Sequence, residues 1–309
     1  MEFIPGVFEV LQPSAPKERM TALEKKCAIR MENITKRFGS KVIANKDVNL
    51  ELYEGEILSL LGENGSGKTT LMNMLSGIYF PDEGQIYVHD KPVTIASPKD
   101  AFDLGIGMIH QHFKLVDLFT ATENIILGLE GKLDLNNARQ KVKDICDKYG
   151  FDIDPDMKIY DMSVSQKQTV EIVKVLYRGA DILILDEPTA VLTPQETEKL
   201  FAVLRKMKED GKSIIIITHK LNEVLAVSDR VAILRKGESV GEIATKDADE
   251  NKLTELMVGK KVALNIERST PENCEDRLEI KGLNVKNHDG VKVLDNVSFT
   301  AKSGEILGI

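Results

Sequence analysis

Two segments of the chain carry the residue types that bind a nucleotide and activate water. Residues 62–70 read Gly-Glu-Asn-Gly-Ser-Gly-Lys-Thr-Thr and fit the pattern G-x-x-x-x-G-K-[ST]. In this pattern the glycines let backbone N–H groups converge on a phosphate, Lys68 adds a positive charge, and the Thr69 hydroxyl can ligate Mg²⁺. We predict that the loop holds the phosphates through Gly62, Glu63, Asn64, Gly65, Ser66, Gly67, Lys68, Thr69 and Thr70.

Residues 182–189 form the second segment, which reads Ile-Leu-Ile-Leu-Asp-Glu-Pro-Thr. This pattern is an apolar strand that ends in two carboxylates, one suited to a metal ion and one to an attacking water. Each segment alone is a moderate signal. Together, in this order, they predict that the chain binds Mg-ATP and hydrolyses it.

The phosphate loop is flanked by the strand and the helix that its function requires. Residues 56–61 predict a buried parallel strand that leads into the loop. The N-terminus of the helix that follows would add positive potential at the phosphates. We expect Pro81 to end this helix, whose apolar face is predicted to consist of Leu71, Met74, Leu75 and Ile78.

Farther along, predicted strands alternate with helices. Residues 100–165 are mostly polar and helical in pattern. Thr193-Pro194-Gln195-Glu196 predicts a helix start, with Thr193 as the N-cap and Glu196 closing a capping box. The alternation implies an α/β fold with a parallel sheet covered on both faces. The further apolar strands are predicted at residues 182–185, 214–218 and 231–234.

The composition is that of an ordinary globular protein. Hydrophobic residues make up 42% of the chain, and the net charge of −8 argues against non-specific binding to nucleic acid. Apolar runs stay far below the roughly 20 residues of a membrane span, and residues 1–26 lack the pattern of a signal peptide. Cys27, Cys146 and Cys274 are scattered, which is typical of reduced thiols in a cytoplasmic protein.

We predict four parts along the chain. Residues 1–27 form a disordered leader, within which either Met1 or Met20 could be the natural start. A complete domain covers residues 28–265, with a helical subdomain at about 100–168. A linker rich in Glu, Pro and Asn covers residues 266–277. Residues 278–309 begin a second, truncated domain.

The second domain is expected because part of the sequence at the start of the first domain is repeated near the end of the chain. Gly55-Glu56-Ile57-Leu58 reappears as Gly304-Glu305-Ile306-Leu307, and Val48 aligns with Val297 at the same spacing. By this spacing a second phosphate loop would begin just beyond Ile309. The alternative is a short C-terminal β extension with chance similarity, and whether the truncation is biological stays open.

With these motifs in place, the complete domain resembles the nucleotide-binding domain of ATP-binding cassette (ABC) transporters, from about Ala28 to Lys260. Residues 168–196 and 217–237 look most like the fused, two-domain ATPases of importers for simple sugars and nucleosides. The resemblance implies a P-loop NTPase (RecA-like) α/β core with an antiparallel β subdomain and a helical signature subdomain.

The resemblance assigns roles around the phosphates. Phe38 matches the aromatic residue that stacks on adenine, a role that suits a flat apolar ring, although a lone Phe before a glycine is more often a core residue. Gln111 matches the Q-loop glutamine, which ligates Mg²⁺ or the attacking water and lies near the membrane partner. A metal site made of His110 and His112 is a poor alternative because no third ligand is evident.

The resemblance also places the reacting groups. Asp186 matches the Mg²⁺ ligand that acts with Thr69, and Glu187 matches the general base. His219 follows a predicted strand and matches the switch histidine that contacts the γ-phosphate and orients Glu187. Thr193 stands where many relatives carry an Asp, and here it serves mainly as an N-cap.

Residues 162–166 stand where the family has its LSGGQ signature, which grips the γ-phosphate held by the opposite domain. Ser163, Ser165 and Gln166 are the predicted contacts. Ser165 replaces a glycine that permits close approach of the backbone to a phosphate. Its hydroxyl could donate a hydrogen bond or its Cβ could weaken closure, and we expect a functional but slower site.

The resemblance implies a subunit at the cytoplasmic face of the plasma membrane. Its partners would be integral-membrane permease subunits, an extracytoplasmic substrate-binding protein, and a second nucleotide-binding domain in the full-length chain or a homodimer. Nucleic acid is not expected as a partner. A soluble ABC ATPase acting on ribosomes or DNA, and a non-hydrolytic nucleotide-binding remnant, remain as alternatives. The transported sugar or nucleoside cannot be named from the sequence.

Overall fold

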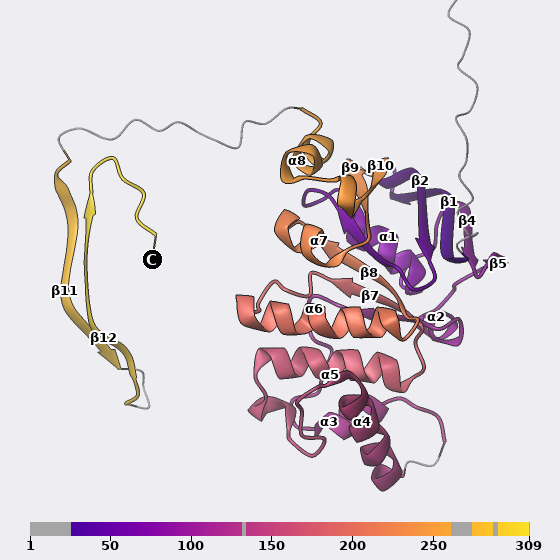
Figure 1. Cartoon of the computed structure of the whole chain (residues 1–309), viewed down its shortest axis with the longest axis horizontal. Helices are drawn as coiled ribbons and strands as arrows, with labels where there is room; N and C mark the ends of the chain where they lie inside the picture. Colours follow the sequence, from indigo (N-terminus) through magenta and orange to yellow (C-terminus); the bar gives the residue numbers. More distant parts are fainter. Residues whose placement is uncertain (1–25, 132–133, 261–273, 287–289, 309) are drawn as a thin grey trace, which may run out of the picture. The chain divides into compact units, whose positions relative to one another are not determined.

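A computed structural model describes residues 26–131, 134–260, 274–286 and 290–308. The chain divides into two compact units, Met1–Val262 and Ala263–Ile309. Figure 1 shows the elements of both. Among the described helices, none combines the length and the apolar character needed to cross a membrane.

A six-stranded sheet forms the centre of the first unit. Its inner strands are parallel, and β10 pairs with β9 in the antiparallel sense. Every residue of β3, β7 and β8 is buried, because helices cover a parallel sheet on both faces. In spatial order the strands are β10 (Glu238–Ala244), β9 (Arg230–Arg235), β3 (Ile57–Leu61), β8 (Ser213–Thr218), β7 (Ile182–Asp186) and β6 (Ile106–Ile109).

One helix, α5 (Val164–Tyr177), packs both against this sheet and against a separate layer of helices. Ile172 and Val175 of α5 pack with the sheet, whereas Val170 and Val173 pack with the helical layer. In Figure 1, α5 runs alongside α6. The remaining helices are α1 (Lys68–Leu75), α2 (Pro98–Asp103), α3 (Ala121–Ile126), α4 (Leu135–Tyr149), α6 (Pro194–Glu209), α7 (Leu221–Val227) and α8 (Glu250–Val258).

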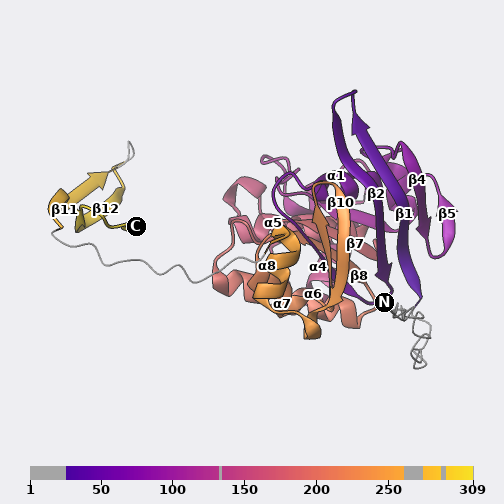
Figure 2. The same ribbon diagram turned by 90° about the horizontal axis from the view of Figure 1, so that it is seen from above.

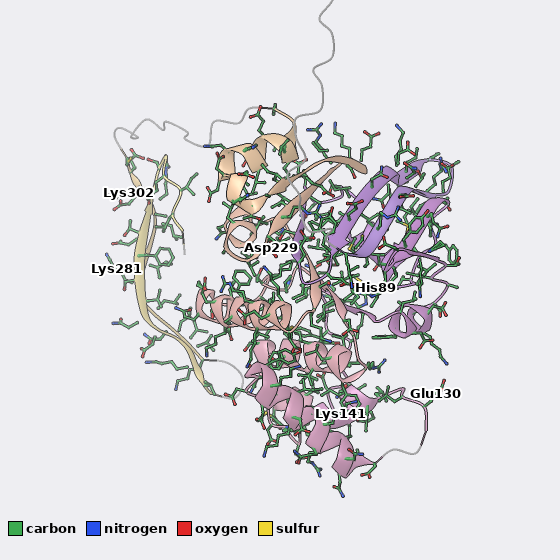
Figure 3. All side chains as sticks on the ribbon, turned by 45° about the vertical axis from the view of Figure 1, so that its right-hand side comes forward. His89, Glu130, Lys141, Asp229, Lys281 and Lys302 are labelled. Atoms are coloured by element: carbon green, nitrogen blue, oxygen red, sulfur yellow. The ribbon has the colours of Figure 1, made fainter. Side chains whose placement is uncertain are left out.

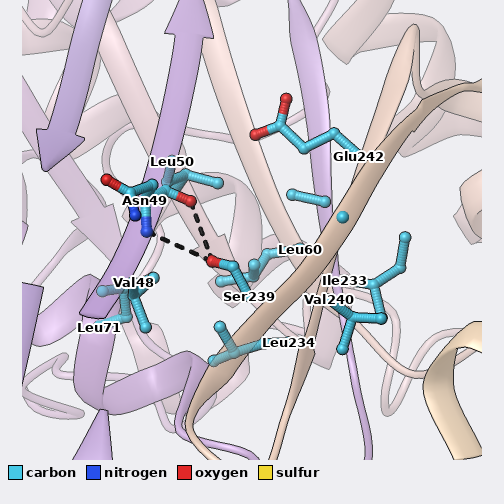
Figure 4. A pocket seen from close by; sticks show the side chains of 12 residues that line it. Val48, Asn49, Leu50, Leu60, Leu71, Ile233, Leu234, Ser239, Val240 and Glu242 are labelled. Carbon is cyan, nitrogen blue, oxygen red and sulfur yellow. Dashed lines mark hydrogen bonds between the residues drawn. The ribbon is translucent and has the colours of Figure 1, made fainter. Parts of the chain in front are cut away.

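An antiparallel sheet forms a further layer of the first unit, and its strands run side by side in Figure 2. Asn49 of β2 joins it to β10, because the Asn49 N–H donates to Ser239 Oγ (3.3 Å) and the Ser239 hydroxyl donates to Asn49 O (3.0 Å). A small cavity of about 250 Å³ lies at this junction (Figure 4). The strands are β2 (Val42–Tyr53), β1 (Cys27–Phe38), β4 (Glu83–Val88) and β5 (Lys91–Val93).

Asp229, labelled in Figure 3, joins β3, β9 and helix α6 at the end of the sheet opposite the phosphate loop. Its carboxylate accepts a hydrogen bond from the Ile57 N–H at the start of β3 (2.9 Å) and pairs with Lys208 of α6. It directly precedes β9. This contact helps to set where β3 begins, and hence where the loop after β3 lies.

Two predictions about this unit are wrong in detail. The helix after the phosphate loop ends at Leu75 rather than at Pro81, because Gly77 adopts a left-handed φ of 74°, and Ile78 is 45% exposed. Residues 100–165 also contain the buried strand β6, which four residues without a periodic pattern could not reveal. A Cβ at Gly107 of β6 would come within 2.8 Å of Val175 Cβ, so α5 packs closely against this strand.

The second unit contains an antiparallel hairpin of β11 (Asp276–Lys286) and β12 (Lys292–Lys302). Its register repeats that of β1 and β2: Asp276 pairs with Lys302 as Cys27 pairs with Tyr53. The positive φ of Asn296 matches that of Asp47. The hairpin therefore pairs in the same register as β1 and β2.

Two strands begin before the predicted domain boundaries. β1 already begins at Cys27, and β11 begins at Asp276, inside the predicted linker, because both strands pair along their whole length with a neighbour. Residues 1–25 of the predicted leader and residues 266–273 of the predicted linker lie outside the described residues.

Candidate functional site

The loop between β3 and α1 leaves the N-terminus of α1 open. Gly67 is the N-cap with a left-handed φ of 97°, and no side chain of the described part of the chain caps it. A Cβ at Gly67 would come within 2.4 Å of Ala44 O, and one at Gly62 within 2.3 Å of Leu234 O. These two positions therefore need glycine for space. The open N–H groups form a site for an anion.

Lys68 and Ser66 place polar groups beside these donors. Lys68 Nζ donates to Gly62 O (2.7 Å) and Glu63 O (3.0 Å), so the ammonium lies within the loop. Burial lowers the pKa of Lys68, and the carboxylates of Glu187 and Asp186 act in the opposite direction. Ser66 Oγ is buried and has no hydrogen-bond partner among the described residues. A bound phosphate would satisfy both groups.

Thr69 and Asp186 bring a hydroxyl and a carboxylate together beside the phosphate loop. Asp186 is the last residue of β7, and its carboxylate accepts a hydrogen bond from the Thr69 hydroxyl. Burial raises the pKa of Asp186, and this hydrogen bond lowers it. A hydroxyl and a carboxylate are hard oxygen ligands and fit Mg²⁺.

Glu187 and His219 meet across the ends of two neighbouring strands. Glu187 follows β7 and His219 follows β8, and His219 Nδ1 lies 2.8 Å from Glu187 Oε1. The Glu187 side chain is 14% exposed. Its backbone adopts a left-handed φ of 49°, with its N–H donating to Ile217 O (2.9 Å). A non-glycine residue in this conformation is strained, and the sequence carried no signal for it.

One cavity of about 550 Å³ gathers most of the predicted site. It opens where the carboxyl ends of β3, β6, β7 and β8 meet, which is where parallel sheets bind ligands. Its lining consists of Val42, Ile43, Ala44, Asn64, Gly65, Ser66, Gly67, Lys68, Thr69, Thr70, Gln111, Asp186, Glu187 and His219.

Phe38 lies apart from this lining in the described structure. Its ring is 39% exposed and packs edge-on against Tyr79, with 5.2 Å between the ring centroids. Val42 and Ile43, at the start of β2, line the cavity instead and are more than half exposed. The sequence analysis missed these two side chains, since exposed apolar residues at a strand end have no distinctive pattern. The contact of Phe38 with adenine stays a prediction.

The family model described as ABC transporter matches residues 45–190. The chain is 50% identical over 285 residues to the nucleoside import ATP-binding protein NupA of Lactococcus lactis subsp. cremoris, and 48% identical over 285 residues to the guanosine import ATP-binding protein NupO of Bacillus subtilis. Residues 45–190 therefore form a domain of the ABC transporter family.

This chain covers about half the length of these relatives. Each alignment spans 91% of the chain and 56% of the relative. Among solved structures, the ADP conformation of an ATP-binding cassette of an ABC transporter matches with a TM-score of 0.66 and 27% identity, over 76% of this chain and 99% of that one. The dimeric structure of a bacterial ABC transporter cassette matches with a TM-score of 0.62 and 29% identity, over 70% and 98%. The predicted fold class is confirmed.

The predicted signature segment lies at the N-terminus of α5 and lines a different cavity from the phosphate loop of the same chain. Ser163 caps the helix: its Oγ accepts from the Gln166 N–H (3.3 Å), and Gln166 Oε1 accepts from the Ser163 N–H (2.9 Å). Ser165 Oγ lies 3.1 Å from Ser163 Oγ. Hydrogen bonds from the Thr193 N–H and from the Ser165 hydroxyl lower the pKa of Glu196. Ser163, Ser165 and Gln166 line a second cavity, of about 730 Å³, between α5 and α6.

Gln111 follows β6 and reaches the phosphate-loop cavity, whereas its neighbour His110 faces a different groove. Burial lowers the pKa of His110. Among the described residues, no group of three His, Cys, Asp or Glu side chains that could hold a metal ion is found. The groove holds a charged set that the sequence analysis missed, made of Lys114, Glu171, Lys174 and Arg178.

Proposed function

We propose that this chain is an ATP-hydrolysing subunit that energises a membrane importer, most specifically one for a simple sugar or a nucleoside. The observation that carries the proposal is the single cavity in which Lys68, Thr69, Asp186, Glu187 and His219 come together. Nucleotide binding alone does not need a carboxylate paired with a histidine at the cavity edge. The substrate class rests on the names of the relatives, which are import proteins for nucleosides and sugars.

Each group has a role in hydrolysis. Lys68 and the open N–H groups of α1 bind the phosphates. Thr69, Asp186 and Gln111 would hold Mg²⁺, which supplies positive charge beside the phosphate oxygens when bound. Glu187 accepts the proton of the water whose oxygen attacks the γ-phosphorus, while the bond from that phosphorus to the bridging oxygen of ADP breaks. His219 donates from Nδ1 to Glu187 and keeps it oriented.

The site would be completed by a second nucleotide-binding domain. Within one chain the signature residues line a different cavity from the phosphate loop. We therefore infer that Ser163, Ser165 and Gln166 act on a nucleotide held by a second copy or a second domain. The dimeric cassette among the similar structures supports this arrangement.

The permease partner would dock at the groove of about 240 Å³ between α2, β6 and α5. His110, the residue before Gln111, lines this groove. Docking and hydrolysis would therefore be coupled through the loop after β6. The charged set Lys114, Glu171, Lys174 and Arg178 would bind polar groups of the permease. Such docking would put the chain at the cytoplasmic face of the plasma membrane, with a substrate-binding protein on the other side.

Mg-ATP turnover of the chain, measured against protein concentration, tests hydrolysis. We expect specific activity to rise with concentration as two chains pair, and Glu187→Gln to abolish turnover while ATP still binds. Glu198→Gln, at an exposed carboxylate of α6, is the matched control and should change neither.

A second candidate function is a nucleotide-binding subunit that does not hydrolyse. The capping box at Ser163 and Gln166 favours it, because the first turn of α5 already satisfies its donors within the chain. ATP binding without turnover at any protein concentration would support this candidate and contradict the first.

A further inference from the structure

Behind the Glu187–His219 pair lies a buried polar network centred on Glu223 of α7. Glu223 is buried, with 8% of the residue exposed. It accepts hydrogen bonds from the Thr189 hydroxyl (2.5 Å) and the Thr218 hydroxyl (3.5 Å), and it pairs with Lys220 Nζ (2.9 Å). A buried carboxylate is costly unless it is paired and hydrogen-bonded, and here it is both.

Lys220 extends the network to the backbone. Its Nζ donates to Thr189 O (3.0 Å) and approaches Thr189 Oγ1 (3.3 Å), and its own N–H donates to Thr218 Oγ1 (3.1 Å). Thr189 follows Glu187 by two positions, and Thr218 and Lys220 are the two neighbours of His219. The network therefore ties the turn after β7 to the loop after β8 on both sides of His219.

The turn after β7 needs such a restraint. Glu187 adopts a left-handed backbone, a conformation that persists only where the surroundings hold it. On one side the Glu187 N–H is fixed to Ile217 O (2.9 Å). On the other side, two residues after Glu187, the Thr189 hydroxyl is hydrogen-bonded to Glu223. Among the described residues, neither Thr189 nor Glu223 lines the phosphate-loop cavity, so the network acts from behind the site.

We propose that Glu223 is a positioning residue for hydrolysis: its carboxylate, together with Lys220, holds the turn after β7 so that Glu187 stays in contact with His219. This inference rests on the proposed function, because it assigns Glu223 a role through Glu187. Glu223 does not touch the nucleotide. Its effect is on the alignment of the base rather than on ATP affinity.

Glu223→Gln tests this role, since the amide keeps the size of the side chain but loses the charge that pairs with Lys220. We expect kcat to fall by about tenfold to a hundredfold, which is typical of a misplacement of about 1 Å at a reacting group. ATP affinity should stay within about twofold. Hydrogen exchange of the Glu187 amide, which is bonded to Ile217 O, should become faster.

Glu56→Gln is the matched control. Glu56 is also a buried carboxylate, 5% exposed, and it accepts hydrogen bonds from Arg230 Nε (2.9 Å) and the Tyr53 N–H (2.9 Å). It directly precedes β3 and so lies at the opposite edge of the sheet from His219. We expect this variant to lose stability as Glu223→Gln does, but to keep kcat and the exchange rate at Glu187.

Thr189→Val completes the experiment because it removes the hydroxyl that joins the turn to Glu223. If the two side chains act through one network, the double variant should lose no more kcat than the more severe single variant. Additive losses would mean that Thr189 and Glu223 act separately.

The outcomes separate this inference from the proposed function. Unchanged kcat and exchange in Glu223→Gln, or equal losses in Glu223→Gln and Glu56→Gln, would overturn the positioning role. If the unmodified chain shows no turnover, the proposed function fails by itself. Faster exchange at Glu187 in Glu223→Gln alone would then still support the network as the restraint on that turn, and its absence would refute it.

Discussion

The N-termini of α1 and α5, which both face phosphate in the proposed mechanism, are built in opposite ways. Gly67 begins α1 in a left-handed conformation, with its backbone donors left open. Ser163 begins α5 in an extended conformation, and its capping box with Gln166 satisfies the first donors within the chain. Thus α1 is ready for an anion before one arrives, whereas α5 must exchange a cap for a ligand.

Steric requirements differ in the same way. Around α1, Gly62 and Gly67 are each pressed against a backbone carbonyl, so the chain itself requires glycine there. Around the start of α5, Val164 is 45% exposed and Ser165 keeps its hydroxyl in hydrogen bonds. The fold therefore tolerates Ser165, and any need for glycine at that position comes from what docks against it.

Lys68→Ala should produce the largest effect and tests whether α1 alone supplies ATP binding. Losing a charge-assisted contact to phosphate should weaken ATP affinity by about a hundredfold. Equilibrium binding of a fluorescent ATP analogue measures it, with Lys99→Ala, an exposed lysine, as the control. A loss of less than about threefold would contradict the role given to Lys68.

Gly67→Ala tests the steric part of the comparison. The left-handed φ and the contact with Ala44 O should together cost about 2 kcal/mol of the free energy of unfolding, measured with urea. Gly65→Ala is the control: φ there is also positive at 78°, but the added Cβ would meet no described atom within 4 Å. Equal costs in the two variants would show that only the backbone conformation matters.

Ser163→Ala should cost about 1 kcal/mol of unfolding free energy, because it removes the N-cap of α5. ATP affinity of the single chain should not change, since Ser163 lies outside the phosphate-loop cavity. Urea unfolding and ATP titration measure the two quantities. A marked loss of ATP affinity would mean that the N-terminus of α5 also contributes to ATP binding within the same chain.

Ser165→Gly should have the smallest effect on stability, a loss of about 0.5 kcal/mol for a glycine in the first turn of a helix. Turnover at high protein concentration should rise by about twofold to fivefold, because glycine permits closer approach to a phosphate. Steady-state turnover and thermal unfolding check both. Lower turnover would mean that the Ser165 hydroxyl itself serves the paired site.

Local patterns predicted much of the fold and of the candidate site. The apolar strands β3, β7, β8 and β9 were expected within a residue or two of their observed ends, because buried parallel strands are short apolar runs. The capping box of α6 at Thr193 formed as predicted. The hairpin β11–β12 copies the register of β1–β2, whereas the sequence analysis noted only the repeat and predicted no register.

Other features had no local signature. β6 is four residues long and gains its place only by pairing with β7. The left-handed backbone of Glu187 is a non-glycine exception, and the Glu223 network joins residues from three separate elements. Val42 and Ile43 line the cavity although their sequence gave no sign of it, and the contact of Phe38 with adenine stays a prediction. Each of these depends on contacts between distant parts of the chain.

The sequence by itself determined the functional groups of the candidate site and the local elements that carry them. These are a glycine-rich loop with Lys68, two carboxylates at a strand end, and a histidine after the next strand. Only the tertiary structure decided that these groups share one cavity, because the strand order β3-β8-β7-β6 brings their carboxyl ends together. It also decided that the signature faces a different cavity. The physical reason is that the functional groups depend only on residue types, whereas the distances between them depend on how the strands and helices pack.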